Sequence, residues 1–203
     1  MKAAIQNRRR VGAVLDRVMR LPILGLVKTP AASLTCFVVA PAKRSGKSLV
    51  ASLLAAALDV DWVASSDMVV ERLEPRLGLA PGTIKAARHS NAESFRAEMV
   101  AEGNRMTADG NAPGVLCVRR GYVVIDGLRR GAEVADASAE ARHLGRTPVV
   151  ICVERASATG TDNSESDALR AAADFTIRND GTIEDLAGEV SRLAKLISTP
   201  AAA

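Results

Sequence analysis

Apolar runs with the composition of β-strands alternate along this chain with segments whose apolar positions recur at helical spacing. The strand-like runs are Leu34–Ala40, Val60–Ala64, Gly121–Asp126, Pro148–Val153 and Asp174–Ile177. Helices are expected from Gly46, from about Met68, over about Ala132–Leu144, from after Asp167 to about Ala172, and over about Ile183–Ile197 after a Thr182 cap. This order predicts a three-layer α/β fold with five parallel strands and helices on both faces of the sheet.

Residues 67–110 are the most polar part of the helical sequence, and prolines and glycines divide them into short pieces. Ser66 or Asp67 is placed to cap the first of these helices. The Ser90–Glu93 pattern is a capping box that predicts a helix to about Glu102. Because ligands of such folds bind beyond the carboxyl ends of the strands, this helical insert is expected to cover the mouth of the sheet and to bind the substrate.

The first 33 residues differ in character from the domain that follows, residues 34–203. Residues 1–21 have an amphipathic pattern with interspersed arginines that predicts a helix, and residues 22–33 read as a connector. Three interpretations remain open for this basic arm. It packs on the domain's own sheet or on a partner, it holds an anionic membrane or nucleic acid, or it is a transit-type presequence.

Charge is distributed unevenly along the chain. Residues 1–30 carry 7 basic residues and 1 acidic residue, a net charge of +6. The rest of the chain carries the remaining 20 basic and 22 acidic residues, a net charge of −2. The pI of about 9.2 therefore reflects the arm and is not the footprint of a nucleic-acid-binding domain. The sequence has no run of 18 apolar residues, so no transmembrane span is expected.

The three cysteines, Cys36, Cys117 and Cys152, lie in or beside apolar runs and have no metal-ligand spacing. This pattern predicts buried, reduced thiols and a cytoplasmic protein. His89 and His143 have no ligand-spaced partners and are expected on helix surfaces. Neither a disulfide framework nor a zinc site is indicated.

The strongest chemical signal is the turn between the first strand and the first helix, which ends in Gly46, Lys47 and Ser48. A strand, a short polar loop and a helix in this order are the context of a P-loop that binds the phosphates of ATP. Lys47 is expected to reach the β- and γ-phosphates, and the Ser48 hydroxyl to bind Mg²⁺. Pro41 stands where the motif has glycine and removes one N–H, but the amides of residues 42–48 remain available. The predicted cofactor-binding residues of this loop are Ala42, Lys43, Arg44, Ser45, Gly46, Lys47 and Ser48.

A second signal is the aspartate at the end of the third strand, Asp126. A hydrophobic strand that ends in aspartate is the Walker B arrangement, in which the carboxylate holds Mg²⁺ directly or through water. Asp67 and Arg155 also follow strand ends and are therefore expected near the same edge of the sheet.

With these motifs, the chain resembles the phage-type deoxynucleoside monophosphate kinases over about residues 34–197. The resemblance is carried by Lys43–Lys47, Val124–Arg129 with Glu133 beyond it, Arg96 with Gly103, Arg155, Ser164–Glu165 and Asn179–Thr182. The chain departs from the family pattern at Pro41, where glycine is usual, at Ser48, where aspartate is frequent, and at Val100, where glutamine is common.

The resemblance implies transfer of the ATP γ-phosphoryl group, with Mg²⁺, to a nucleoside monophosphate. It implies that Arg96 and Arg129 bind the acceptor phosphate, because a guanidinium grips a phosphate with two hydrogen bonds. Asp67 is expected to orient the acceptor. Arg155, Asn179 and Gly181 are expected beside the adenine of ATP, with Arg155 over the ring or its phosphates.

Two other functions remain open at this stage. The chain is a P-loop kinase for another acceptor, such as a modified base in DNA held by the basic arm, or a regulatory module that binds ATP without transferring phosphate. The sequence discloses neither the accepted base and sugar nor the oligomeric state, a homodimer included.

Overall fold

A computed structural model describes residues 33–91, 93–158 and 164–198 of the chain. The predicted basic arm falls on residues 1–32, outside this part. The described elements are β1 (Leu34–Val39), α2 (Lys47–Leu58), β2 (Trp62–Ala64), α3 (Ser65–Arg76), α4 (Thr83–Ser90), α5 (Arg96–Ala108), α6 (Pro113–Arg119), β3 (Val124–Asp126), α7 (Gly131–His143), β4 (Thr147–Glu154), α8 (Ser164–Ala171), β5 (Phe175–Arg178) and α9 (Ile183–Ser198).

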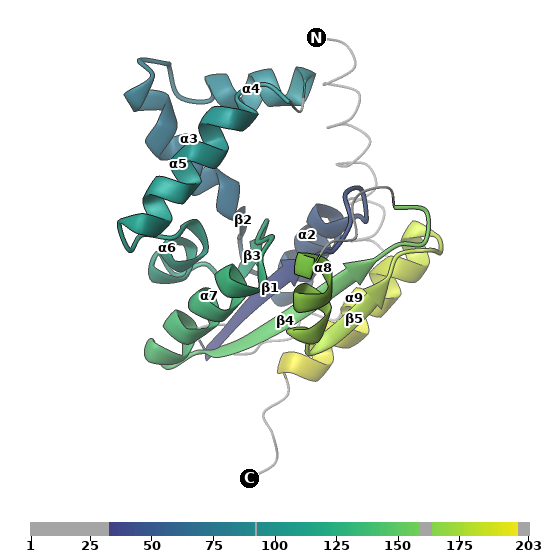
Figure 1. Cartoon of the computed structure of the whole chain (residues 1–203). Coiled ribbons are helices and arrows are strands. Elements are labelled where there is room, and N and C mark those ends of the chain that lie inside the picture. The colour runs from purple at the N-terminus through teal and green to yellow at the C-terminus, as the bar shows by residue number, and fades with distance from the viewer. Residues whose placement is uncertain (1–32, 92, 159–163, 199–203) are drawn as a thin grey trace.

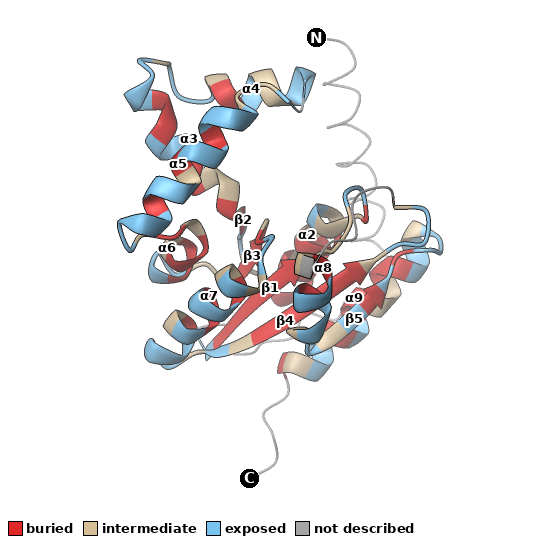
Figure 2. Ribbon diagram, in the orientation of Figure 1, coloured by how far each residue is buried: buried red, intermediate tan, exposed pale blue. Residues whose placement is uncertain are grey.

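The strands form one parallel sheet in the order β2-β3-β1-β4-β5, which confirms the predicted fold class. Side chains alternate across β1 because successive residues of a strand point to opposite faces. Cys36 and Val38 pack with α2 and α9 on one face, whereas Phe37 and Val39 pack on the other face against a core that includes α3, α6 and α7. Strands β1 and β3 are buried throughout and β4 over most of its length, and they form the buried centre of the sheet in Figure 2.

Helices α3, α4 and α5 make up most of the predicted insert and extend beyond the sheet in Figure 1. Residues 113–119, for which the sequence predicted no element, form the additional helix α6. Pro113 occupies the first turn of α6, where an N–H group would have no partner within the helix, so its absence costs nothing. A proline favours the start of a helix for this reason, and Pro113 is the sequence signal that could have predicted α6.

Two predicted helix caps of the insert are wrong. Neither Ser66 nor Asp67 caps α3, because β2 passes into the helix without a loop and Ala64 is its N-cap residue. Ser90 does not open a helix but ends α4. Asn91 Oδ1 accepts a hydrogen bond from the Glu93 N–H at 3.1 Å, which turns the chain, and α5 begins only at Arg96.

Other local predictions are confirmed. At the start of α9, the Asp185 N–H donates to Thr182 Oγ1 at 3.1 Å, and Asp185 Oδ2 accepts from the Thr182 N–H at 3.0 Å. Helix α8 begins at Ser164, a few residues earlier than expected. His89 and His143 are exposed. None of the helices in the described part of the chain has the length and apolar character needed to span a bilayer.

The three thiols are free and buried, as predicted. Burial raises the pKa of Cys36 and of Cys117 to about 12 and that of Cys152 to about 11. For Cys117, the negative charges of Asp67 and Asp126 add to the effect of burial. These side chains therefore stay protonated at neutral pH and serve as core residues rather than nucleophiles.

Candidate functional site

The loop between β1 and α2 has a backbone that only certain residues tolerate. Arg44 and Gly46 both have positive φ, at 62° and 91°. A Cβ on Gly46 would also overlap the side-chain amide of Asn179, which donates a hydrogen bond to the Ser45 carbonyl at 2.7 Å. Glycine is thus required at residue 46 for two reasons, its φ and its close contact with Asn179.

The backbone amides of this loop are unpaired as far as the described residues show. None of the N–H groups of residues 42–48 donates a hydrogen bond to an acceptor in the described part of the chain, whereas the Gly46 carbonyl already accepts from Leu49 and Val50 at 2.9 and 3.0 Å. The N-terminus of the 12-residue helix α2 begins in the same loop. Unpaired amides beside the positive end of a helix dipole form a site that favours an anion such as a phosphate group.

Lys47 and Asp126 meet beside this loop. The Lys47 ammonium lies 3.3 Å from Asp126 Oδ2, and the carboxylate is buried while the lysine is about one quarter exposed. The register of the sheet explains this contact. Asp126 ends β3 opposite Val38 of β1 and Ala64 of β2, so it lies at the edge of the sheet where the loop after β1 begins. Asp126 Oδ2 makes no hydrogen bond of good geometry within the described residues, so this buried oxygen has one charged neighbour and unused acceptor capacity.

The side chains around Asp126 fit a magnesium ion that also binds phosphate. A carboxylate oxygen with spare capacity and the exposed Ser48 hydroxyl are the hard oxygen ligands that Mg²⁺ prefers. The described residues contain no group of three or more His, Cys, Asp or Glu that could hold a metal by themselves. Mg²⁺ here would accordingly take further ligands from phosphate oxygens and water, as is usual for this ion.

A cavity of about 620 Å³ opens above the loop. Its walls are the loop itself, the chain from Leu128 to Arg130, Arg96 of α5 and one side of α8. Helix α8 is hydrogen-bonded to the loop after β1 and to the start of α7. Ser166 Oγ donates to the Pro41 carbonyl at 3.3 Å, and Glu165 Oε2 accepts from the Gly131 N–H at 3.2 Å.

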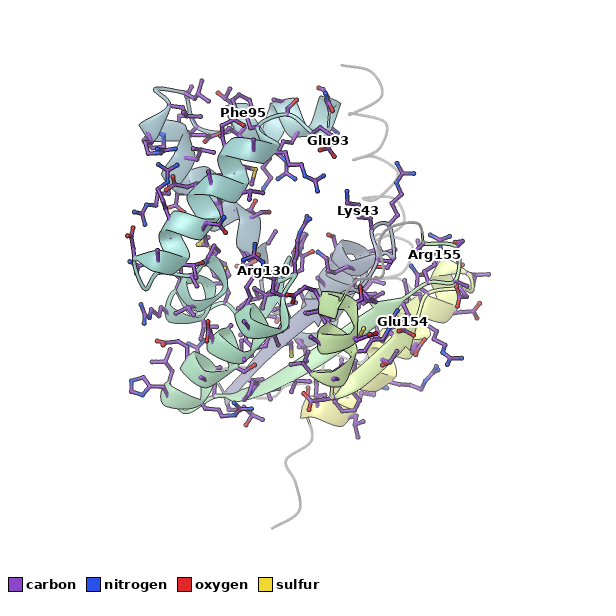
Figure 3. The ribbon with its side chains drawn as sticks, in the orientation of Figure 1. Lys43, Glu93, Phe95, Arg130, Glu154 and Arg155 are labelled. Carbon is purple, nitrogen blue, oxygen red and sulfur yellow. The ribbon has the colours of Figure 1, made fainter. Side chains whose placement is uncertain are left out.

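A second cavity, of about 490 Å³, lies between the loop and the helical insert. Six residues line both cavities, and five of them are basic: Lys43, Arg44, Arg96, Leu128, Arg129 and Arg130. Three of the residues that line this second cavity are labelled in Figure 3, where Lys43 lies below Glu93 in the view and Arg130 lies below both. The shared basic wall is where two negatively charged ligands, one in each cavity, would approach each other.

Two carboxylates of the second cavity hold groups of the shared wall. Glu93 receives two hydrogen bonds from Arg96 Nη1, at 2.8 and 3.0 Å. Glu133 accepts from the Arg129 N–H at 2.8 Å and lies 3.9 Å from the Arg130 guanidinium. The side chains of Arg129 and Arg130 are exposed, and both residues line both cavities.

The structure brings together only part of the predicted site. The predicted loop residues, Arg96 and Arg129 line the first cavity, and Asp126 lies beside Lys47. Asp67 lines neither cavity and pairs with Lys85 at 3.3 Å. Arg155, Asn179 and Gly181 also line neither cavity, and the Asn179 side chain supports the loop through Ser45 instead.

Further lining residues are not among the predicted site residues, although Glu165 belongs to the Ser164–Glu165 pair that carries the resemblance. Arg88, Arg130 and Glu165 line one or both cavities. The signal for Arg130 was its place directly after Arg129 at a strand end. Arg88 could not be separated by pattern from the other insert arginines, because the direction in which a helical arginine points depends on how that helix packs.

Comparison with known proteins gives little further information. No protein-family model matches the chain, and no curated protein sequence matches it. Among solved structures, the chain is similar to one from Chloroflexus aurantiacus J-10-fl described as "a putative kinase". That match has 11% sequence identity and a TM-score of 0.45, and covers 82% of this chain and 98% of the other. Similarity of this degree does not establish a shared activity.

Proposed function

We propose that the chain is a P-loop kinase that transfers the γ-phosphoryl group of ATP to a nucleoside or deoxynucleoside monophosphate. The observation that carries the proposal is the shared basic wall between the two cavities. A kinase for a phosphorylated acceptor must hold two anions close together, and a wall of five basic residues reduces their repulsion.

In this proposal the triphosphate of ATP binds the unpaired amides of residues 42–48, and Lys47 contacts its β- and γ-phosphates. Ser48 and Asp126 are the residues that would hold Mg²⁺, which supplies charge neutralisation when bound. Because Asp126 also holds the Lys47 ammonium at 3.3 Å, the lysine is oriented before the nucleotide arrives.

The acceptor phosphate lies against Arg96 and Arg129 in the second cavity. One of its oxygens attacks the γ-phosphorus, a new P–O bond forms, and the bond to the oxygen bridging the β- and γ-phosphorus atoms breaks. ADP and a nucleoside diphosphate result. The attacking oxygen is already ionised at neutral pH, so the protein has to supply position and positive charge rather than a general base.

The direct test is transfer of label from [γ-³²P]ATP to each nucleoside monophosphate by the purified full chain. We expect a labelled diphosphate with at least one acceptor. We expect Lys47→Ala to reduce transfer by about 100-fold or more, the usual effect of removing a charge that stabilises the transition state. Lys195→Met, a change in the last turn of α9 that touches neither cavity, serves as the control.

Circular dichroism of the Lys47→Ala variant checks that its helices are intact. Absence of a labelled diphosphate with every acceptor would overturn the proposal. ATP binding without any transfer would instead indicate a regulatory ATP-binding module, and transfer to DNA alone would indicate the other acceptor class.

A further inference from the structure

Two segments of the candidate site lie on different elements but have to act together in the proposed reaction. They are the phosphate loop, residues 41–48, and the wall segment, residues 128–131, which carries Arg129. Within the described residues, no hydrogen bond joins the phosphate loop directly to the wall segment. The sheet positions the chain only as far as Asp126, where β3 ends. Other contacts therefore have to fix the position of the wall segment.

Helix α8 is hydrogen-bonded to both segments through two adjacent residues. Ser166 is buried, and its Oγ donates to the Pro41 carbonyl at 3.3 Å. Glu165 Oε2 accepts a hydrogen bond from the Gly131 N–H at 3.2 Å. The first turn of this helix thus connects the start of the phosphate loop to the end of the wall segment.

The hydrogen bond from Gly131 to Glu165 also completes the start of α7. Arg130, the N-cap residue of α7, makes no capping hydrogen bond with its side chain. The first N–H groups of a helix have no partners within the helix, and negative charge is favourable at this end of the helix dipole. Glu165 supplies an acceptor and a negative charge from a different helix, which stabilises the contact between α7 and α8.

Gly131 allows α8 to approach α7 more closely than another residue would. A Cβ at this position would lie 2.9 Å from the Ala168 Cβ, closer than two carbon atoms pack, and 3.8 Å from the Ala168 carbonyl carbon. A side chain at residue 131 would push α8 away from α7. Because α8 also holds Pro41, this shift would change the separation of the phosphate loop and the wall segment.

We infer, on the basis of the function proposed above, that α8 sets the distance between the γ-phosphate of ATP and the acceptor phosphate. Gly131, Glu165 and Ser166 are the positioning residues, and they act through the two segments that they hold. Glu165 is negatively charged and would repel a phosphate rather than bind it. A displacement of about 1 Å can lower the rate of a reaction between positioned groups about 100-fold, although each ligand keeps its own contacts. Helix α8 therefore controls kcat rather than affinity.

The first experiment moves one methyl group across the contact between α7 and α8. Gly131→Ala introduces the overlap, and we expect kcat to fall about 10-fold to 100-fold, with KM for ATP and for the acceptor within about threefold of the wild type. Ala168→Gly removes the opposing Cβ and alone leaves kcat within about twofold. In the double variant the nearest atom of α8 lies 3.8 Å from the new Cβ, an ordinary contact, so kcat returns to within about threefold of the wild type.

The second experiment removes the two hydrogen bonds of α8. We expect Glu165→Met and Ser166→Ala each to lower kcat about 10-fold. Glu165→Gln keeps a side-chain oxygen that can accept from the Gly131 N–H, so it loses less than Glu165→Met. Asp167→Asn is the matched control and changes neither kcat nor KM, because Asp167 is an exposed carboxylate of the same turn that lines neither cavity.

All variants are measured in the full chain with a nucleoside monophosphate that the wild type phosphorylates. A single turnover with the protein in excess separates the transfer step from product release. Thermal unfolding identifies any variant whose loss of rate reflects loss of structure. If Gly131→Ala does not fold, the two Glu165 variants decide the question, and equal losses of kcat in both would overturn the inference.

Three further results would overturn the inference while the proposed function stands. They are a normal kcat in Gly131→Ala, a loss of kcat in that variant that Ala168→Gly does not reverse, and a higher KM for ATP with unchanged kcat in Glu165→Met. The last result would mean that Glu165 contacts the nucleotide itself. Absence of transfer from ATP to every nucleoside monophosphate by the wild type would overturn the proposed function, and the inference with it.

Discussion

Replacement of Gly46 by alanine is the sharpest test of the loop geometry. The new Cβ would overlap the Asn179 side-chain amide and lie 3.3 Å from its Cγ atom, at a backbone φ of 91°. Asn179 would have to move away from Ser45, whose carbonyl it now contacts at 2.7 Å. The substitution thus disturbs the loop by backbone strain and by the loss of one buried hydrogen bond.

The two effects have separate magnitudes. A non-glycine residue in the left-handed region costs about 1–2 kcal/mol, and a buried carbonyl left without its donor costs about 1–3 kcal/mol. We therefore expect Gly46→Ala to lower the free energy of unfolding by about 2–5 kcal/mol. Asn179→Ala alone should cost about 1–3 kcal/mol, and in that background the glycine substitution should cost only the strain.

The double variant should be more stable than the sum of the single changes predicts, by about 1–3 kcal/mol. Urea unfolding of the wild type, both single variants and the double variant gives this coupling energy. Titration calorimetry with Mg·ATP measures the second consequence, a loss of affinity of at least about tenfold in Gly46→Ala, because the loop amides no longer converge. A coupling energy near zero would refute the contact, and unchanged ATP affinity would refute the role of the loop.

Two further predictions concern stability away from the cavities. Glu102 is buried and ion-paired at 3.1–3.2 Å with three half-exposed arginines of α3 and α5. We therefore expect Glu102→Gln to lower the free energy of unfolding, measured in urea, by about 1–3 kcal/mol. A loss below about 0.5 kcal/mol would contradict this prediction. The Cys36 thiol has its pKa raised by burial from an ordinary value of 9.0 to about 12, so the unfolded chain loses this proton first and stability falls as the pH rises from about 9 towards 12. Cys36→Ala should make the decline between pH 9 and 10.5 shallower, by at most about 1.4 kcal/mol per pH unit, and an identical slope in both proteins would refute the assignment.

The strand and helix order could be predicted from the sequence because it depends on local periodicity. The loop from β1 to α2 and the aspartate at the end of β3 could be proposed from the sequence because each motif is continuous in the chain, and the structure places Lys47 3.3 Å from Asp126. The start of α5 could not be predicted in this way, because the Glu93 carboxylate binds Arg96 rather than the backbone of Ser90. The spacing in the sequence shows that Glu93 could bond the backbone of Ser90. Only the packed structure shows that it bonds Arg96 instead.

The walls of the cavities could be predicted only in part, because they depend on contacts between distant segments. Asn179 is 134 residues from Ser45 in the chain, yet its amide supports the loop. Asp67 follows a strand end, as the site residues do, but its carboxylate pairs with Lys85 of α4. A strand end places the backbone of a residue near the site, and the rotation of the following helix decides where its side chain points.

Pro41 raises the question whether the missing glycine of the motif weakens ATP binding. The positive φ values of the loop occur at Arg44 and Gly46, and the unpaired amides begin at Ala42, so neither feature needs a glycine at residue 41. The Pro41 carbonyl accepts a hydrogen bond from Ser166 of α8 at 3.3 Å, and the fixed φ of proline keeps this start of the loop stiff.

We therefore expect Pro41→Gly to lower the free energy of unfolding by about 0.4–1 kcal/mol through the greater entropy of the unfolded chain, and to leave ATP affinity within about threefold. Ala42→Gly is the matched control, because it adds flexibility next to residue 41 without adding an amide. Urea unfolding and calorimetry with Mg·ATP measure both quantities. If Pro41→Gly binds ATP tenfold more tightly and Ala42→Gly does not, the added N–H contacts phosphate, and the proline weakens the site after all.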